Sequence, residues 1–154
     1  MKINIKLFIG ILAIGLIGIT ACKKKKDESP KAKLSGKWKL TQIGTDANNN
    51  SIMEASEVET LPDTFVVYMT FNGDGNGSVS TDLFGSTLST GFTWTLINND
   101  ADINVKAAPG SSSFFTVTEG TVHIHTLSFT DLVTRDTSSM SGTLTHNWSV
   151  FKKQ

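Results

Sequence analysis

The chain has 154 residues, a formal net charge of zero, 18% charged residues and a single cysteine. This length suits one globular domain, and a lone cysteine excludes a disulfide within the chain. The charge is unevenly spread, because residues 34–154 hold twelve of the fourteen acidic residues but only six of the fourteen basic ones. An acidic domain repels phosphate backbones, so the composition argues against nucleic acid as a partner.

The first 21 residues have the pattern of a secretory signal peptide. Lys2 and Lys6 precede an apolar run over 7–19, and small residues follow before Cys22. A positive start, a short apolar stretch and a small-residue cleavage site are the three parts of such a signal. The apolar run is shorter than the roughly 20 residues that span a bilayer. We therefore expect residues 1–21 to be removed.

The residues at the cleavage site carry a more specific resemblance. Ile19-Thr20-Ala21-Cys22 resembles the lipobox of bacterial lipoproteins. In that family the cysteine is acylated and the signal is cut just before it. The resemblance implies that Cys22 carries palmitate and that the membrane is a partner through this residue, since two or more acyl chains give stable anchoring. An ordinary signal peptide with an incidental cysteine is the alternative.

Residues 22–33 join this anchor to the rest of the chain. Lys23–Lys33 contains six lysines and no large apolar side chain, which predicts a flexible, solvated linker. Charged residues after a lipobox also resemble surface-export signals of some Gram-negative lineages, although Asp27 and Glu28 lie further from the cysteine than is usual there. We expect an outer-membrane lipoprotein whose domain faces either the periplasm or the cell surface.

Residues 34–154 alternate between apolar and polar side chains. Turn signals separate the runs, of which Asn72-Gly73-Asp74-Gly75-Asn76-Gly77 is the strongest. Nine candidate strands follow from this period of two: 37–43, 64–71, 77–82, 92–96, 101–106, 113–118, 121–127, 131–135 and 143–151. Only 51–61 has a helical pattern, so we expect one short helix in the first long loop. The fold class is all-β, as an antiparallel barrel without exposed edges or as a β-sandwich.

The start of the domain favours the barrel. Gly36-Lys37-Trp38 resembles the Gly-x-Trp signature of the lipocalin family, and the order of motifs after it resembles small bacterial lipocalin-like lipoproteins. This resemblance implies an eight-stranded up-and-down barrel whose base is closed by Trp38, with Gly36 beside it. Arg135, the only arginine, precedes the last strand, whereas the lipocalin base arginine lies within it. A plain core tryptophan is the alternative for Trp38.

A barrel of this size holds either side chains or one small ligand. We therefore predict that the domain binds a small apolar or amphipathic molecule inside the barrel, and that it is not an enzyme. Six aromatic residues are the candidate lining: Phe65, Phe71, Phe92, Trp94, Phe114 and Trp148. The alternative is that these side chains fill the barrel, which would then act as a structural or adaptor module of the cell envelope with a protein partner.

The segment 46–57 has the ligand spacing of an EF-hand calcium loop. Oxygen-bearing side chains occupy positions 1, 3, 5, 9 and 12 of a twelve-residue frame: Asp46, Asn48, Asn50, Glu54 and Glu57. Serine replaces the usual glycine at position 6 of this frame. Calcium is thus a possible cofactor, and a solvated asparagine-rich loop is the alternative.

Two further constellations are weak. His123, His125 and His146 have the residue types of a three-histidine zinc site, but the alternation turns His123 and His125 away from the core. No Gly-x-Ser-x-Gly elbow is present, and the single cysteine is assigned to the anchor. Nothing in the sequence therefore indicates a nucleophilic enzyme.

Overall fold

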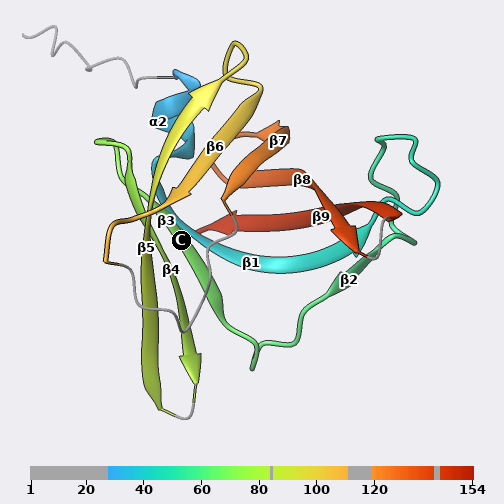
Figure 1. Cartoon of the computed structure of the whole chain (residues 1–154). Coiled ribbons are helices and arrows are strands. Elements are labelled where there is room, and N and C mark those ends of the chain that lie inside the picture. Colours follow the sequence, from blue (N-terminus) through green and yellow to red (C-terminus); the bar gives the residue numbers. More distant parts are fainter. Residues whose placement is uncertain (1–27, 84, 111–118, 141–142) are drawn as a thin grey trace, which may run out of the picture.

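The computed structural model describes residues 28–83, 85–110, 119–140 and 143–154. This part of the chain contains one helix, α2 (Pro30–Leu34), followed by antiparallel strands only (Figure 1). The strands are β1 (Gly36–Thr45), β2 (Val58–Thr60), β3 (Val67–Phe71), β4 (Asn76–Leu83), β5 (Ser86–Ile97), β6 (Asp102–Ala107), β7 (Gly120–Leu127), β8 (Asp131–Met140) and β9 (Thr143–Lys153). No helix among the described residues is long and apolar enough to cross a membrane.

The strands form one closed barrel. From β3 to β9 each strand pairs with the next along the chain, and β1 pairs with both β3 and β9. Eight strands thus close the sheet, and β2 is an additional short strand beside the second half of β1. The predicted all-β barrel is confirmed and the sandwich is excluded. The predicted strand 113–118 lies outside the described residues.

The pleat of the strands places the main core inside the barrel. Alternate residues of β5 and β6 are buried, because successive side chains of a strand point to opposite faces. The core consists of Leu34, Trp38, Phe71, Phe92, Trp94, Ile103, Val105, Leu132 and Phe151. The ring of Phe71 meets those of Phe92 and Trp94 edge-on, with centroids 5.5 and 5.4 Å apart. Such pairs add stabilisation beyond the area that they bury.

Trp38 and α2 close one end of the barrel. The Trp38 side chain is fully buried, as predicted, and its indole nitrogen donates a hydrogen bond to the Leu34 carbonyl at 2.7 Å. The ammonium of Lys153 lies 4.9 Å from the centre of the Trp38 ring and donates to the Lys33 carbonyl. A cation over an indole is an attractive contact. Lys153, from the last strand, therefore supplies the cation at this base.

Gly36 allows this closure. Its φ of +134° is unfavourable for other residues, and a Cβ here would lie 2.6 Å from the Lys153 side chain.

The predicted linker 22–33 is not a linker throughout, because its last residues belong to helix α2. Ser29 caps this helix by accepting a hydrogen bond from Ala32, and Pro30 stands in the first turn, where its missing N–H is not needed. Burial of Leu34 then fixes the helix against the barrel.

The helix predicted over 51–61 is not formed. This segment consists of turns followed by β2, and the helix of the domain lies before β1 instead. Asn49 and Ser51 have positive φ values of 54° and 62°, which interrupt a right-handed helix. The glutamates that suggested a helix use their carboxylates in the loop, where the Glu57 side chain accepts hydrogen bonds from backbone N–H groups. Hydrogen bonds between side chains and the local backbone have thus replaced the backbone hydrogen bonds of a helix.

Candidate ligand-binding site

The inner wall changes from apolar to polar along the three adjacent strands β1, β9 and β8. Cross-strand register defines three successive rows of inward-facing side chains. From the base outwards these rows are Leu40–Phe151–Leu132, Ile43–Ser149–Thr134 and Thr45–Asn147–Asp136. The row next to the base is wholly apolar, and the row at the open end is wholly polar. A molecule inside the barrel would therefore meet hydrocarbon at one end and hydrogen-bonding groups at the other.

A small cavity lies within this gradient. Its volume is about 140 Å³, which is close to the ~150 Å³ of an engineered apolar cavity that binds benzene. The apolar part of its wall comes from Met69, Phe71, Ile103, Val105, Val122, Leu132 and Phe151. Thr134, Asp136 and Ser149 complete the wall on one side. The cavity is thus sized for a six-carbon group and has polar groups at a single end.

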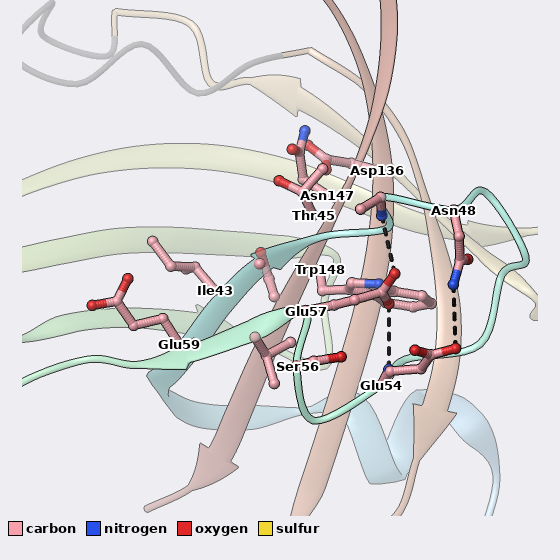
Figure 2. Close-up of a pocket in the computed structure, with 14 residues that line it drawn as sticks. Ile43, Thr45, Asn48, Glu54, Ser56, Glu57, Glu59, Asp136, Asn147 and Trp148 are labelled. Atoms are coloured by element: carbon pink, nitrogen blue, oxygen red, sulfur yellow. Dashed lines mark hydrogen bonds between the residues drawn. The ribbon is translucent and has the colours of Figure 1, made fainter.

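An open depression continues from this polar end. It has a volume of about 860 Å³ and is lined by fourteen residues, several of which Figure 2 labels. Asp136 and Ser149 line both the cavity and the depression, so the two spaces adjoin at these residues. Four carboxylates line the depression and none of its lining residues is lysine, arginine or histidine. The carboxylates belong to Glu54, Glu57, Glu59 and Asp136.

Asp136 differs from the other three carboxylates. Glu54 and Glu57 are used in hydrogen bonds within their own loop, and Glu59 is exposed. Asp136 is half-buried, and within the described part of the chain no hydrogen bond or ion pair reaches its carboxylate. The neighbouring Arg135 points to the other face of β8, where its guanidinium binds Asp46. The carboxylate of Asp136 is therefore available at the mouth of the cavity.

The loop between β1 and β2 covers the outer face of the barrel. Trp148, Val133 and Val150 form a second cluster there, against which Met53 and Val58 pack. These positions alternate with the inward-facing residues of β8 and β9, so their side chains point away from the interior. Gly44 lets the loop come close, because a Cβ at this position would lie 2.0 Å from the Glu57 carbonyl. The indole nitrogen of Trp148 is buried without a hydrogen-bond partner among the described residues.

A buried ion pair fixes the start of this loop. The Arg135 guanidinium lies 2.8 Å from the Asp46 carboxylate, whose side chain is fully buried. The same carboxylate accepts hydrogen bonds from the backbone N–H groups of Asn50 and Ser51. Two backbone donors and a guanidinium together satisfy a buried charge, which would otherwise be costly.

The five predicted calcium ligands gather in this loop but bind one another. Asn48 and Asn50 donate through their amides to one oxygen of Glu54, at 3.2 and 3.0 Å. Glu57 accepts from the backbone N–H groups of Ala47 and Glu54 (Figure 2). Among the described residues, no three acidic, histidine or cysteine side chains are grouped so that they could hold a metal ion. The oxygen-rich pattern is therefore accounted for by the hydrogen bonds that shape the loop.

The structure distributes the six predicted lining residues widely. Phe71 lines the cavity, whereas Phe92 and Trp94 belong to the core without lining it. Phe65 is 48% exposed. Trp148 lies on the outer face of the barrel under the loop, where it lines the open depression and not the barrel interior, so neither side chain lines the interior as predicted. Phe114 lies outside the described residues. The prediction placed Trp148 and Val150 on the inner face of the last strand. In the structure Phe151 is the residue that faces the core, so Trp148 and Val150 point outwards.

The three histidines do not converge. His123 Nδ1 lies 2.7 Å from the Asp102 carboxylate, and His146 Nδ1 lies 2.9 Å from the Thr137 hydroxyl. The ring of His125 packs edge-on against Trp148, with the centroids 5.1 Å apart. Hydrogen bonds from Asn98 and then His123 lower the pKa of Asp102 below its ordinary value. All three histidines thus have local contacts on the outside of the barrel.

The polar residues of the open end were not predicted from the sequence patterns. Thr45, Asp136, Asn147 and Ser149 were not singled out, although each stands at an inward position of a strand. The available signal was the phase of β9: once Phe151 is placed inside, Ser149 and Asn147 must also face inwards. Their register with β1 and β8 then brings Thr45 and Asp136 beside them.

Comparisons with known proteins agree with this fold. A family model described as a lipocalin-like domain matches residues 34–134. No curated protein sequence matches the chain. Solved structures with a similar fold include a deswapped triple mutant of bovine odorant-binding protein, with 20% identity over 79% of this chain and 74% of that one and a TM-score of 0.42. Bovine lipocalin allergen Bos d 2 has 14% identity over 80% and 75% of the two chains, with a TM-score of 0.45.

A third similar structure is Japanin from Rhipicephalus appendiculatus bound to cholesterol, with 11% identity over 77% of this chain and 74% of that one and a TM-score of 0.48. These likenesses concern the barrel fold. The family model covers most of the domain, including the base tryptophan, the first six strands of the closed barrel and the start of the seventh, β8. The chain therefore belongs to the family of lipocalin-like domains.

Proposed function

We propose that this protein is a lipid-anchored lipocalin-like binding protein that holds one small amphipathic molecule at the open end of its barrel. The observation that carries the proposal is the junction of an apolar cavity of about 140 Å³ with an open depression whose wall includes four carboxylates. Burial of an apolar group in such a cavity is favourable by roughly 25 cal/mol per Å². The polar row would orient the other end of the molecule towards water.

The size of the cavity limits the ligand. Drug-sized molecules occupy pockets of about 300–1,000 Å³, which is more than the enclosed space here. The buried part of the ligand is therefore about as large as a phenyl ring or a six-carbon chain. Any larger part would have to lie in the open depression.

Filling the cavity tests the proposal. Val122 lines the cavity and is only partly buried, so Val122→Phe should occupy the space where the ligand would bind. Binding would be measured by isothermal titration with benzyl alcohol and hexanol, and by native mass spectrometry of the protein from its own host. We expect Val122→Phe to weaken binding at least tenfold. Thr121→Phe, on the outer face of the same strand, is the matched control and should bind as the wild type does.

The anchor gives the barrel an orientation. Helix α2 precedes β1 at the closed end (Figure 1). The depression, in contrast, is lined by residues at the far end of β1. A chain tethered to a membrane through Cys22 would thus enter the domain at its base. The ten residues of β1 span about 33 Å at 3.3 Å per residue. This arrangement favours a mouth directed away from the membrane, where it would take its ligand from the aqueous phase.

The anchor itself is tested by Cys22→Ser. Metabolic labelling with palmitate followed by membrane fractionation should show that the variant is unlabelled and no longer partitions with outer membranes. Protease treatment of intact cells would then distinguish a periplasmic domain from a surface-exposed one. A Cys22→Ser variant that still incorporates palmitate would exclude the lipoprotein assignment.

An adaptor function is the second candidate. Four large apolar side chains are exposed on loops and strands near the open end: Ile43, Ile52, Phe65 and Leu144, with 43, 60, 48 and 64% exposure. Exposed apolar side chains mark protein contacts when they form a continuous patch. Loss of partner binding in Ile52→Ser and Leu144→Ser, with no effect of Val122→Phe, would favour this function over ligand binding.

A further inference from the structure

We infer that the ligand of this barrel is a cationic amphiphile, an amine on a small apolar body, whose ammonium group lies beside the carboxylate of Asp136. This inference rests on the proposed function and specifies the chemical class of its ligand. The relevant observation is the position of one carboxylate where the apolar cavity opens into the depression.

Asp136 is placed to meet the polar end of a bound molecule. It lines both spaces, and it stands in the row Thr45–Asn147–Asp136, two rows above the apolar row Leu40–Phe151–Leu132. Rows on the same face of a strand are two residues apart, or about 6.6 Å. Two rows, or about 13 Å, thus separate Asp136 from the apolar row. Asp136 itself lines the cavity, however, and the cavity is about as large as a phenyl ring, so a short substituent on a ring bound there would reach the Asp136 carboxylate.

The surroundings of Asp136 favour a cation over other polar groups. The depression contains three further carboxylates and no basic side chain. The one nearby guanidinium, of Arg135, is held on the opposite face by Asp46. An ammonium here would gain an ion pair in a half-buried place, where a unit charge pair interacts more strongly than in bulk water. An anionic ligand of the same shape would be repelled by every charged group in the lining.

A neutral ligand would leave Asp136 without a charged partner. Lone carboxylates that are half-buried lose part of their hydration, and a cation compensates this loss better than a hydroxyl does. The hydroxyl and amide groups of Thr45, Ser149 and Asn147 supply acceptors as well, which an ammonium with three donors can use. The open end thus has the acceptor-rich chemistry that suits a primary amine.

The experiment compares three ligands that share one apolar body. Benzylamine, benzyl alcohol and benzoate would be titrated into the full chain reconstituted in phospholipid nanodiscs, so that no detergent competes for the cavity. Hexylamine, hexanol and hexanoate form a second series. We expect the amine to bind about tenfold more tightly than the alcohol, and the carboxylate to bind most weakly. The preference should shrink at high salt, because a half-exposed ion pair is screened.

Substitution of the carboxylate identifies its role. Asp136→Asn keeps the shape and should bring the amine and the alcohol within about twofold of each other, because binding of the amine loses its ion pair. Asp63→Asn is the matched control, since it removes the same charge from a fully exposed loop position and should preserve the preference. Equal melting temperatures of the three proteins would show that the changes come from binding.

The outcomes separate the two proposals. If the alcohol binds and the amine is not preferred, or if Asp136→Asn keeps the preference, the cationic ligand is rejected and the binding function stands. Tighter binding of benzoate would also reject it. If no member of either series binds to the wild type, the binding function fails and this inference fails with it.

Discussion

The two ends of this barrel are built from the same strands but have opposite properties. At the closed end, Trp38, Phe71 and Trp94 are almost fully buried and Lys153 lies over the Trp38 ring. At the open end, the inward positions carry polar side chains and the nearest apolar cluster lies outside the barrel under a loop. The comparison indicates that the closed end supplies stability, which leaves the open end free for binding.

The difference arises within single strands. In β9, Phe151 contributes to the core, while Ser149 and Asn147 on the same face line the site. Because side chains alternate, Trp148 and Val150 between them must point outwards, where the loop 46–57 covers them. One strand therefore stabilises the barrel interior near its end and binds a loop on its outer face near its start.

The largest effect is expected at the closed end. Trp38→Ala removes a fully buried indole together with its hydrogen bond to Leu34, and it should lower the free energy of unfolding by about 3–5 kcal/mol. Equilibrium denaturation with urea measures this loss. The matched variant Thr45→Ala, at the open end of the same strand, should change the stability little. Similar losses for both variants would contradict the division between the two ends.

The outer loop is fixed by a buried charge, which predicts the next largest effect. Arg135→Ala leaves the carboxylate of Asp46 buried without its cation, and it should cost about 3 kcal/mol of unfolding free energy. Lys152 pairs with Asp131 on the surface of the neighbouring strand, so Lys152→Ala is a matched control and should have little effect. The two variants compared by urea denaturation would show whether the loop depends on its buried ion pair.

A smaller effect is expected at Glu57. Its carboxylate accepts backbone hydrogen bonds from Ala47 and Glu54, and Glu57→Gln replaces one of the two acceptor oxygens by a donor. The variant should lose about 1–2 kcal/mol in calcium-free buffer. The calcium hypothesis makes a different prediction, because it requires a rise in melting temperature with calcium that Glu57→Gln abolishes. A thermal shift series in calcium and magnesium distinguishes the two.

The closed end was the more predictable part from sequence. Gly36 and Trp38 are a local motif, and the alternation of Phe92 and Trp94 determines which face of β5 is buried. Both signals depend on residues close together in the chain. The all-β class followed from such local patterns, whereas the up-and-down barrel and the buried Trp38 at its base were implied by the resemblance of Gly36-Lys37-Trp38 to the lipocalin signature.

The open end depended on contacts that a local pattern does not contain. Trp148 was assigned to the interior because an aromatic residue on a strand usually faces the core, but Val58 and Met53 give it an equally apolar place outside. Arg135 and Asp46 are far apart in the sequence, and no local motif around either residue predicts their ion pair. Asp136 was overlooked because its role depends on register with β9 and β1, which only the closed sheet defines.

The smallest effect is expected from pH, on the outer face near the β5–β6 turn. Hydrogen bonds from Asn98 and His123 lower the pKa of Asp102, so folding favours the ionised carboxylate. Its contribution to stability is then complete above the unfolded-state pKa of about 3.9 and is lost as the pH falls through the lower folded-state value. Asp102→Asn should therefore be slightly less stable than the wild type at pH 6, with a gap that closes as the pH approaches 2. Carboxyl-carbon NMR titration would give the folded-state pKa directly. A gap that persists unchanged to pH 2 would show that the charge of Asp102 makes no contribution, and that its hydrogen bonds hold the turn in either ionisation state.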